Sequence, residues 1–178
     1  MSRRHPVTGH KGHFEYRYLP EIVYGGIDGS VTTFAVVAGV IGASLSASIV
    51  LILGFANLFA DGFSMAISNY LSKRSEQDSG IVLKKTPAKS ALVTFSAFFL
   101  IGLAPLLPFI LAFFLKIKID HLFTYSAVLT ALAFLFVGYF KGDVLSKHKI
   151  KSAIETLAIG GIAAVLAFTA GYLLRGLA

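Results

Sequence analysis

Two aspartates, Asp28 and Asp61, lie well inside long apolar stretches of this 178-residue sequence. A charged aspartate at the centre of a membrane helix costs about 2.5 to 3.5 kcal/mol on insertion scales. Such a residue therefore needs an ionic partner, a water-filled cavity or a bound ion. We interpret these two aspartates as the first candidates for an ion pathway.

A stripe of polar residues runs along the second apolar stretch. At about 100° per residue, its members share one arc of about 100° on a helix: Asn57, Asp61, Ser64, Met65, Ser68 and Ser72. Serines alone usually pack membrane helices or form hydrogen bonds between them. The carboxylate in line with them favours a functional path from mid-membrane to one surface.

Asp28 and Met65 form a candidate pair of ligands. Asp28 lies six residues in from Ile22, and Met65 lies six residues in from Leu71. If the two stretches are antiparallel helices, both residues lie at the same depth, about 9 Å. A carboxylate with a thioether suits a borderline divalent ion such as Fe²⁺ better than Mg²⁺ or Ca²⁺. A methionine in an apolar helix more often only packs, so this interpretation depends on its neighbours, including Thr32 on the same face as Asp28.

Glu155 lies near the start of the last apolar stretch and has two interpretations. Ser152 and Glu155 have the spacing of a capping box, in which two side chains satisfy backbone amides at a helix start. A glutamate at this boundary can also take part in transport. The cap is the favoured interpretation, and one residue can do both.

The composition indicates the elements that must position these residues. Apolar residues make up 56% of the chain and the mean hydropathy is +0.76, more than a soluble domain can cover. The absence of cysteine excludes disulfide frameworks and thiolate metal sites. Five stretches are long enough to cross about 30 Å of hydrocarbon: 22–42, 49–71, 90–115, 121–140 and 152–174. The predicted fold class is therefore all-α, a polytopic integral membrane bundle of five transmembrane helices.

The third stretch is interrupted by Gly102, Pro105 and Pro108. Prolines in a membrane helix remove backbone hydrogen bonds, so a kink or an unwound turn is expected near mid-depth. Such a break can serve as a gate, but a kink that only helps packing is the more common case.

The distribution of basic residues predicts an N-in, C-out topology. With the N-terminus in the cytoplasm, Lys116, Lys118 and Arg175 are the only ones of sixteen basic residues left outside. We assign residues 1–20 to a cytoplasmic N-terminal tail and residues 21–178 to one transmembrane domain. Five helices of one chain hardly enclose a polar path, so a homodimer is expected.

Several motifs of this chain resemble the vacuolar iron transporter (VIT) family. They are YGGIDGSVTTFAVVAGVIGA (24–43), ADGFSMAISNYL (60–71), GLAPLLPF (102–109) and IGG (159–161). The resemblance covers about residues 19–174 and is most specific in the first two helices. It implies a five-helix dimer that exports Fe²⁺, and often Mn²⁺, from the cytosol in exchange for protons, through a pore between the subunits. The family's functional aspartate falls on Asp28 and its methionine on Met65.

The chain departs from the family pattern in two places. Plant members carry a glutamate in the second helix where this chain has Asn57, and Asp61 lies one turn later. The segment 72–89 replaces a much longer, glutamate-rich cytoplasmic metal-binding domain. Only Glu76 and Asp78 remain there to recruit metal ions, so capture from the cytosol is expected to be weaker or to depend on another protein.

The sequence thus predicts a proton-coupled exporter of Fe²⁺, with Mn²⁺ as a further cargo. Asp28 and Met65 hold the ion and Asp61 couples its release to protonation, while other polar residues line the pore or relay protons: Asn57, Thr32, Ser64, Ser68 and Glu155. The alternatives are a non-transporting membrane interaction protein and an exporter of Co²⁺ or Ni²⁺.

Other function classes find no support in the sequence. No Ser/His/Asp or Cys/His arrangement predicts an enzyme, and no resident cofactor is expected. The basic residues flank predicted membrane spans, which argues against binding of nucleic acid. The expected location is the plasma membrane of a prokaryote, with a vacuolar membrane as the alternative; the expected partners are the metal ion, protons, the bilayer and a second copy of the chain.

Overall fold

The computed structural model describes residues 12–82, 85–116, 121–145 and 147–177, with side chains from residue 17 onward. Its helices are α1 (Gly12–Gly42), α2 (Ala47–Asp78), α3 (Pro87–Gly102), α4 (Leu107–Leu115), α5 (Leu122–Val144) and α6 (Lys149–Leu174). Two short 3-10 turns, η1 (Ala104–Leu106) and η2 (Arg175–Leu177), complete the ordered elements. Five segments are long and apolar enough to cross a membrane, because α3 and α4 together form one of them. The prediction of an all-α bundle of five transmembrane helices is confirmed.

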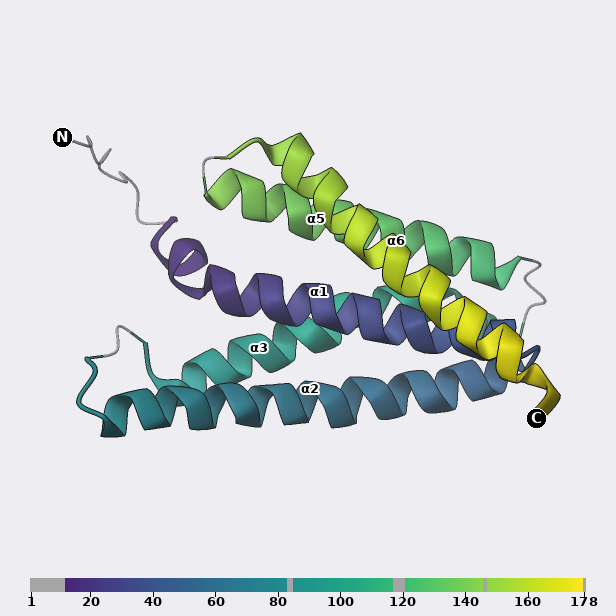
Figure 1. The fold of residues 1–178 in the computed structure, drawn as a ribbon, viewed down its shortest axis with the longest axis horizontal. Coiled ribbons are helices and arrows are strands. Elements are labelled where there is room, and N and C mark those ends of the chain that lie inside the picture. Colours follow the sequence, from purple (N-terminus) through teal and green to yellow (C-terminus); the bar gives the residue numbers. More distant parts are fainter. Residues whose placement is uncertain (1–11, 83–84, 117–120, 146, 178) are drawn as a thin grey trace.

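Helix α1 is the central element of the bundle. It packs against α2, α3, α5 and α6, and Figure 1 shows it running between these neighbours. In the most apolar 18-residue stretch of α1, 56% of the residues are buried, whereas only 6% are buried in the corresponding stretch of the last span, which contains α6. Any side chain that must be held rigidly is therefore best placed on α1.

The approach of α1 to α3 depends on glycine. A Cβ atom at Gly25 would lie 2.5 Å from the carbonyl oxygen of Thr94, and one at Gly29 would collide with the backbone of Phe98. Small residues let membrane helices pack with their backbones close together. This contact holds the face of α1 that carries Asp28 in a fixed position relative to α3.

The third span is broken, as the sequence predicts. Helix α3 ends at Gly102, η1 contains Pro105, and α4 begins at Leu107 with Pro108 in its first turn. The hydroxyl of Ser126 on α5 donates a hydrogen bond of 2.6 Å to the carbonyl oxygen of Pro105. Both residues are buried, so the break is a packed element of the bundle with a side chain from α5 satisfying its backbone.

The two ends of the bundle are distinct. The start of α1, the connection between α2 and α3, and the connection between α5 and α6 lie at one end, which we call the α2–α3 end (Figure 1). The turn between α1 and α2 and the end of α6 lie at the other. Helix α1 begins ten residues before the predicted span, so residues 12–20 continue it, with Tyr18 and Leu19 buried. Residues 1–11 of the predicted tail lie outside the described residues.

We expect Gly29→Ala to lower the free energy of unfolding by about 2 kcal/mol, because the added methyl group would push α1 away from the backbone of α3. The matched control is Gly161→Ala on α6, where a Cβ meets nothing within 4 Å and the change should be neutral or slightly stabilising. Unfolding of the purified variants in mixed detergent micelles, followed by circular dichroism, checks this. Equal stability of Gly29→Ala and the unmodified protein would contradict the close packing of α1 on α3.

Candidate functional site

The structure brings Asp28 and Asp61 together across α1 and α2. Asp28 is half-buried and Asp61 is exposed, and the hydrogen bond between Asn57 and Thr32 places the two aspartates at the same level. Asp28 also borders a cavity of about 450 Å³ whose other lining residues include Tyr24, Val31 and Ile159 of α6. Two carboxylates at one level make a centre that attracts cations.

The register of α1 and α2 is set by Asn57. Its side-chain amide donates hydrogen bonds of 3.2 Å to the hydroxyls of Thr32 and Thr33. In an antiparallel pair this contact places Asp61, one turn further along α2, opposite Asp28. Asn57 therefore joins the two helices just beyond the carboxylates, and its role in lining the pore stays a prediction.

Met65 lies closer to the α2–α3 end than the sequence analysis expected. It borders a cavity of about 420 Å³ together with Glu21, Tyr24, Ser68 and Asn69, which we call the Met65 pocket. The register places Met65 about one turn, or roughly 6 Å, from the level of Asp28. The predicted equal depth is wrong because it was counted from hydropathy boundaries, whereas α2 continues to Asp78 and its register depends on Asn57.

The predicted polar stripe of α2 is divided between two faces. Met65 is buried, with 9% of its surface exposed, and Asn57 is partly buried against α1. Asp61, Ser64, Ser68 and Ser72 are exposed on the outside of the single chain. The exposed part of the stripe runs past large apolar side chains such as Phe63 and Ile67, which are also exposed. A single copy of the chain thus leaves a carboxylate and three hydroxyls exposed along this helix.

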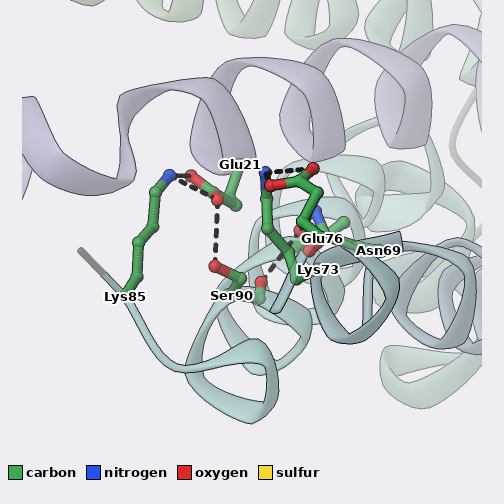
Figure 2. A network of polar contacts seen from close by, with 7 residues as sticks. Glu21, Asn69, Lys73, Glu76, Lys85 and Ser90 are labelled. Carbon is green, nitrogen blue, oxygen red and sulfur yellow. Dashed lines mark hydrogen bonds and ion pairs between the residues drawn. The ribbon is translucent and has the colours of Figure 1, made fainter. Parts of the chain in front are cut away.

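Glu21 was missed by the sequence analysis. It is only 2% exposed, and Lys85 donates hydrogen bonds of 2.5 and 2.7 Å to its two carboxylate oxygens. The hydroxyl of Ser90 on α3 adds a third bond of 3.0 Å (Figure 2). Glu21 lies two helical turns before Asp28, so the spacing of seven residues was the signal that could have found it.

The two acidic residues predicted to capture metal ions, Glu76 and Asp78, each have a basic partner. Lys73 contacts both carboxylate oxygens of Glu76 at 3.1 and 3.2 Å, as Figure 2 shows. Arg74 contacts Asp78 at 3.2 Å. These pairs are partly or fully exposed, and exposed pairs typically contribute only about 0 to 1 kcal/mol. An incoming cation can therefore displace their partners at little cost.

The predicted capping box of Ser152 and Glu155 is wrong. Helix α6 begins at Lys149, and the backbone amide of Ser152 already donates to the carbonyl oxygen of His148 at 3.0 Å. The basic residues before the apolar stretch extend the helix, so Ser152 lies inside it and needs no cap. Glu155 is exposed on α6, and its part in proton transfer stays a prediction.

Among the described residues, no group of three His, Cys, Asp or Glu side chains is gathered closely enough to hold a metal ion. The acidic side chains of the site that the structure describes instead lie one after another along α1 and α2. Glu21 lies beside the Met65 pocket, and Asp28 with Asp61 lies deeper in the bundle. The arrangement is a series of separate cation-attracting positions.

Comparison with known proteins gives consistent matches. The VIT family model matches residues 19–85 and 79–172. The vacuolar iron transporter of Toxoplasma gondii is 29% identical over 225 residues, covering 89% of this chain and 74% of that protein. Vacuolar iron transporter 1 of Arabidopsis thaliana is 28% identical over 210 residues, with 83% and 82% covered. The vacuolar iron transporter of Plasmodium falciparum is 40% identical over 67 residues, which are 38% of this chain and 24% of that protein.

Replacing Asn57 by leucine should lower the free energy of unfolding by about 1 kcal/mol, because the hydrogen bonds between α1 and α2 are lost and the buried hydroxyl of Thr33 loses this partner. Unfolding in mixed micelles measures the change. Thr169→Val is the control, since that hydroxyl bonds only within exposed α6, to Val165, and the variant should match the unmodified protein. Indistinguishable stabilities for both variants would contradict a register set by Asn57.

Proposed function

The chain belongs to the VIT family, and we propose that it exports Fe²⁺ from the cytosol, with protons moving in the opposite direction. The relatives that it matches over most of its length are vacuolar iron transporters. The five membrane-spanning segments and the carboxylates within them support the same activity. Mn²⁺ is proposed as a second cargo, because the carboxylates of Asp28 and Asp61 also suit this ion.

The exposed carboxylate of Asp61 carries this proposal. In a bilayer, the outside of α2 would face hydrocarbon, where a charged aspartate costs about 2.5 to 3.5 kcal/mol. A second copy of the chain, packed on this face by a two-fold axis, would cover Asp61, Ser64 and Ser68 with the same residues of its partner. The result is a homodimer whose interface encloses a polar path lined from both sides.

The order of residues along α1 and α2 supports the steps that we propose for this path. An ion from the α2–α3 end meets Ser68 and Met65 first, and then the level of Asp28 and Asp61. We assign ion binding to Asp28 and Met65 of both subunits and proton coupling to Asp61. Thr32 and Asn57, which are hydrogen-bonded to each other beyond the carboxylates, are proposed to line the path towards the other membrane face.

The α2–α3 end is the proposed cytoplasmic end. Arg17, Lys73, Arg74, Lys85 and Lys89 all lie there, and basic residues gather on the cytoplasmic side of membrane proteins. This orientation makes transport from the Met65 pocket to the other end an export from the cytosol. We propose the plasma membrane of a prokaryote as the location, with a vacuolar membrane as the alternative.

Liposomes that contain the purified protein should take up Fe²⁺ under an imposed pH gradient and anaerobic conditions. Asp28→Ala should abolish this flux because it removes a carboxylate from the ion's path. Asp61→Asn should remove only its dependence on the pH gradient. Asp143→Asn is the matched control, since that carboxylate pairs with Lys149 between α5 and α6, and its flux should equal that of the unmodified protein.

The contrary outcomes are distinct from one another. No flux of Fe²⁺ or Mn²⁺ through folded dimers would contradict iron export. Flux of Co²⁺ or Ni²⁺ alone would change the cargo, and no flux of any divalent ion would favour a non-transporting membrane protein.

A cysteine at position 64 should crosslink two copies of the chain in the membrane, because Ser64 is exposed on the face of α2 that the dimer covers. The sequence contains no cysteine, so Ser64→Cys provides a single reactive thiol. Treatment with a short bifunctional maleimide and a denaturing gel measures the product. The control is Ile162→Cys on α6, 63% exposed, which should stay monomeric on the gel. Equal crosslinking of both variants, or none, would contradict an interface on α2.

A further inference from the structure

We infer that Lys85 is a tethered competitor of the transported cation, because its ammonium group occupies the buried carboxylate of Glu21 at the mouth of the ion path. This inference rests on the proposed function, because it concerns the entry of the same ion. The competition would act before the ion reaches Asp28 and Asp61. Lys85 would thus set the cation concentration at which transport begins.

The contact of Lys85 with Glu21 has the geometry of an occupied cation site. One positive group lies within 2.7 Å of both carboxylate oxygens, and Ser90 completes the shell of the carboxylate (Figure 2). Glu21 is 2% exposed, and the side chain of Lys85 is 19% exposed. A carboxylate this deeply buried needs a positive partner, because an unpaired buried charge is strongly destabilising. A divalent cation could meet that need in place of Lys85.

The position of Glu21 makes such an exchange relevant to transport. Glu21 borders the Met65 pocket, which also contains Tyr24, Ser68 and the side chain of Asn69. It lies on α1 two turns before Asp28, on the same side of the helix. A cation that reached Glu21 would therefore stand beside Met65 and at the start of the line of carboxylates.

A second cavity beside Lys85 can accept its ammonium group when that group leaves Glu21. Lys85 borders the Met65 pocket and also this second cavity of about 500 Å³, which Gln77 and Thr86 help to line. Lys85 belongs to the connection between α2 and α3 and precedes the first helical residue, Pro87. Its flexible four-carbon side chain can turn from one cavity to the other while α1 and α3 keep their places.

Competition by Lys85 lowers the apparent affinity of Glu21 for the cation, and the size of this effect can be calculated. The apparent dissociation constant is the intrinsic one divided by the fraction of molecules in which Glu21 is free. If Lys85 occupies Glu21 for about 90 to 99% of the time, the apparent affinity falls by about 10- to 100-fold. The exposed pairs of Glu76 and Asp78 impose no comparable barrier.

The same contact could instead serve only to tie the connection between α2 and α3 to α1. A purely structural role predicts that loss of Lys85 destabilises the protein and lowers maximal flux. Competition predicts in addition that the loss of Lys85 strengthens cation binding. Transport and binding measurements therefore separate the two roles.

The test compares anaerobic Fe²⁺ uptake into liposomes for the unmodified protein and Lys85→Met. We expect the half-saturating Fe²⁺ concentration of Lys85→Met to fall by about tenfold or more. In the double variant Glu21→Gln, Lys85→Met this gain should disappear, because the carboxylate that Lys85 guarded is gone. The matched control is Lys89→Met, which removes an exposed positive charge from the second cavity and should leave the half-saturating concentration unchanged.

A binding measurement keeps the inference separate from transport. Fe²⁺ should raise the melting temperature of purified Lys85→Met more than that of the unmodified protein, whether or not either one carries Fe²⁺ across a membrane. Absence of flux with this difference in binding would overturn the proposed function and support the inference. Normal flux with unchanged half-saturation and equal Fe²⁺-induced shifts would overturn the inference alone.

Two further outcomes are decisive. Equal gains in Lys85→Met and Lys89→Met would show a general effect of surface charge and overturn the inference. If Lys85→Met does not fold, Lys85→Arg replaces it, because a guanidinium group pairs with both carboxylate oxygens at once and should raise the half-saturating concentration. A lower or unchanged value in Lys85→Arg would overturn the inference.

Discussion

The low dielectric of the bilayer is the constraint on which this structure depends, because every polar group at lipid depth must find a partner. Several hydroxyls in the core of the single chain meet this need within their own helices. Ser30 donates to Gly26, Thr130 to Ser126 and Thr156 to Ser152. The face of α2 with Asp61 has no such arrangement among its exposed side chains. In the proposed function, the second copy of the chain and the transported ion supply the partners that this face lacks.

The glycines of α1 help to position the polar side chains of the site. Gly25 and Gly29 bring α1 against the backbone of α3, and Glu21 and Asp28 lie on the same helix just before them. The close approach places Ser90 within reach of Glu21. Asn69 on α2 meets Thr94 one turn further along α3, at 3.1 Å. The polar residues around the Met65 pocket are thus positioned by one tightly packed contact between α1 and α3.

The fold was largely predictable from the sequence, whereas the site was predictable only in part. Length and hydropathy identify membrane spans, and prolines mark a break such as that at Pro105, because both signals are local. The register of α1 against α2 depends on Asn57 meeting Thr32, a contact between residues 25 positions apart that periodicity does not contain. Glu21 was missed because the hydropathy boundary was drawn at residue 22, although α1 begins at Gly12. Ser152 resembled a helix cap because the same boundary at α6 was drawn too late.

Positive charge at the α2–α3 end has two consequences that oppose each other. Basic residues favour retention of a membrane-protein segment in the cytoplasm, and this tendency supports the proposed orientation. The same residues also neutralise the carboxylates that would attract a metal ion, since Lys73, Arg74 and Lys85 contact Glu76, Asp78 and Glu21. Burial decides which of these ion pairs is strong. Water screens the pairs of Glu76 and Asp78, but it hardly reaches the pair of Glu21 and Lys85. The short connection between α2 and α3 therefore brings one lysine of this basic end, Lys85, onto the buried carboxylate of Glu21.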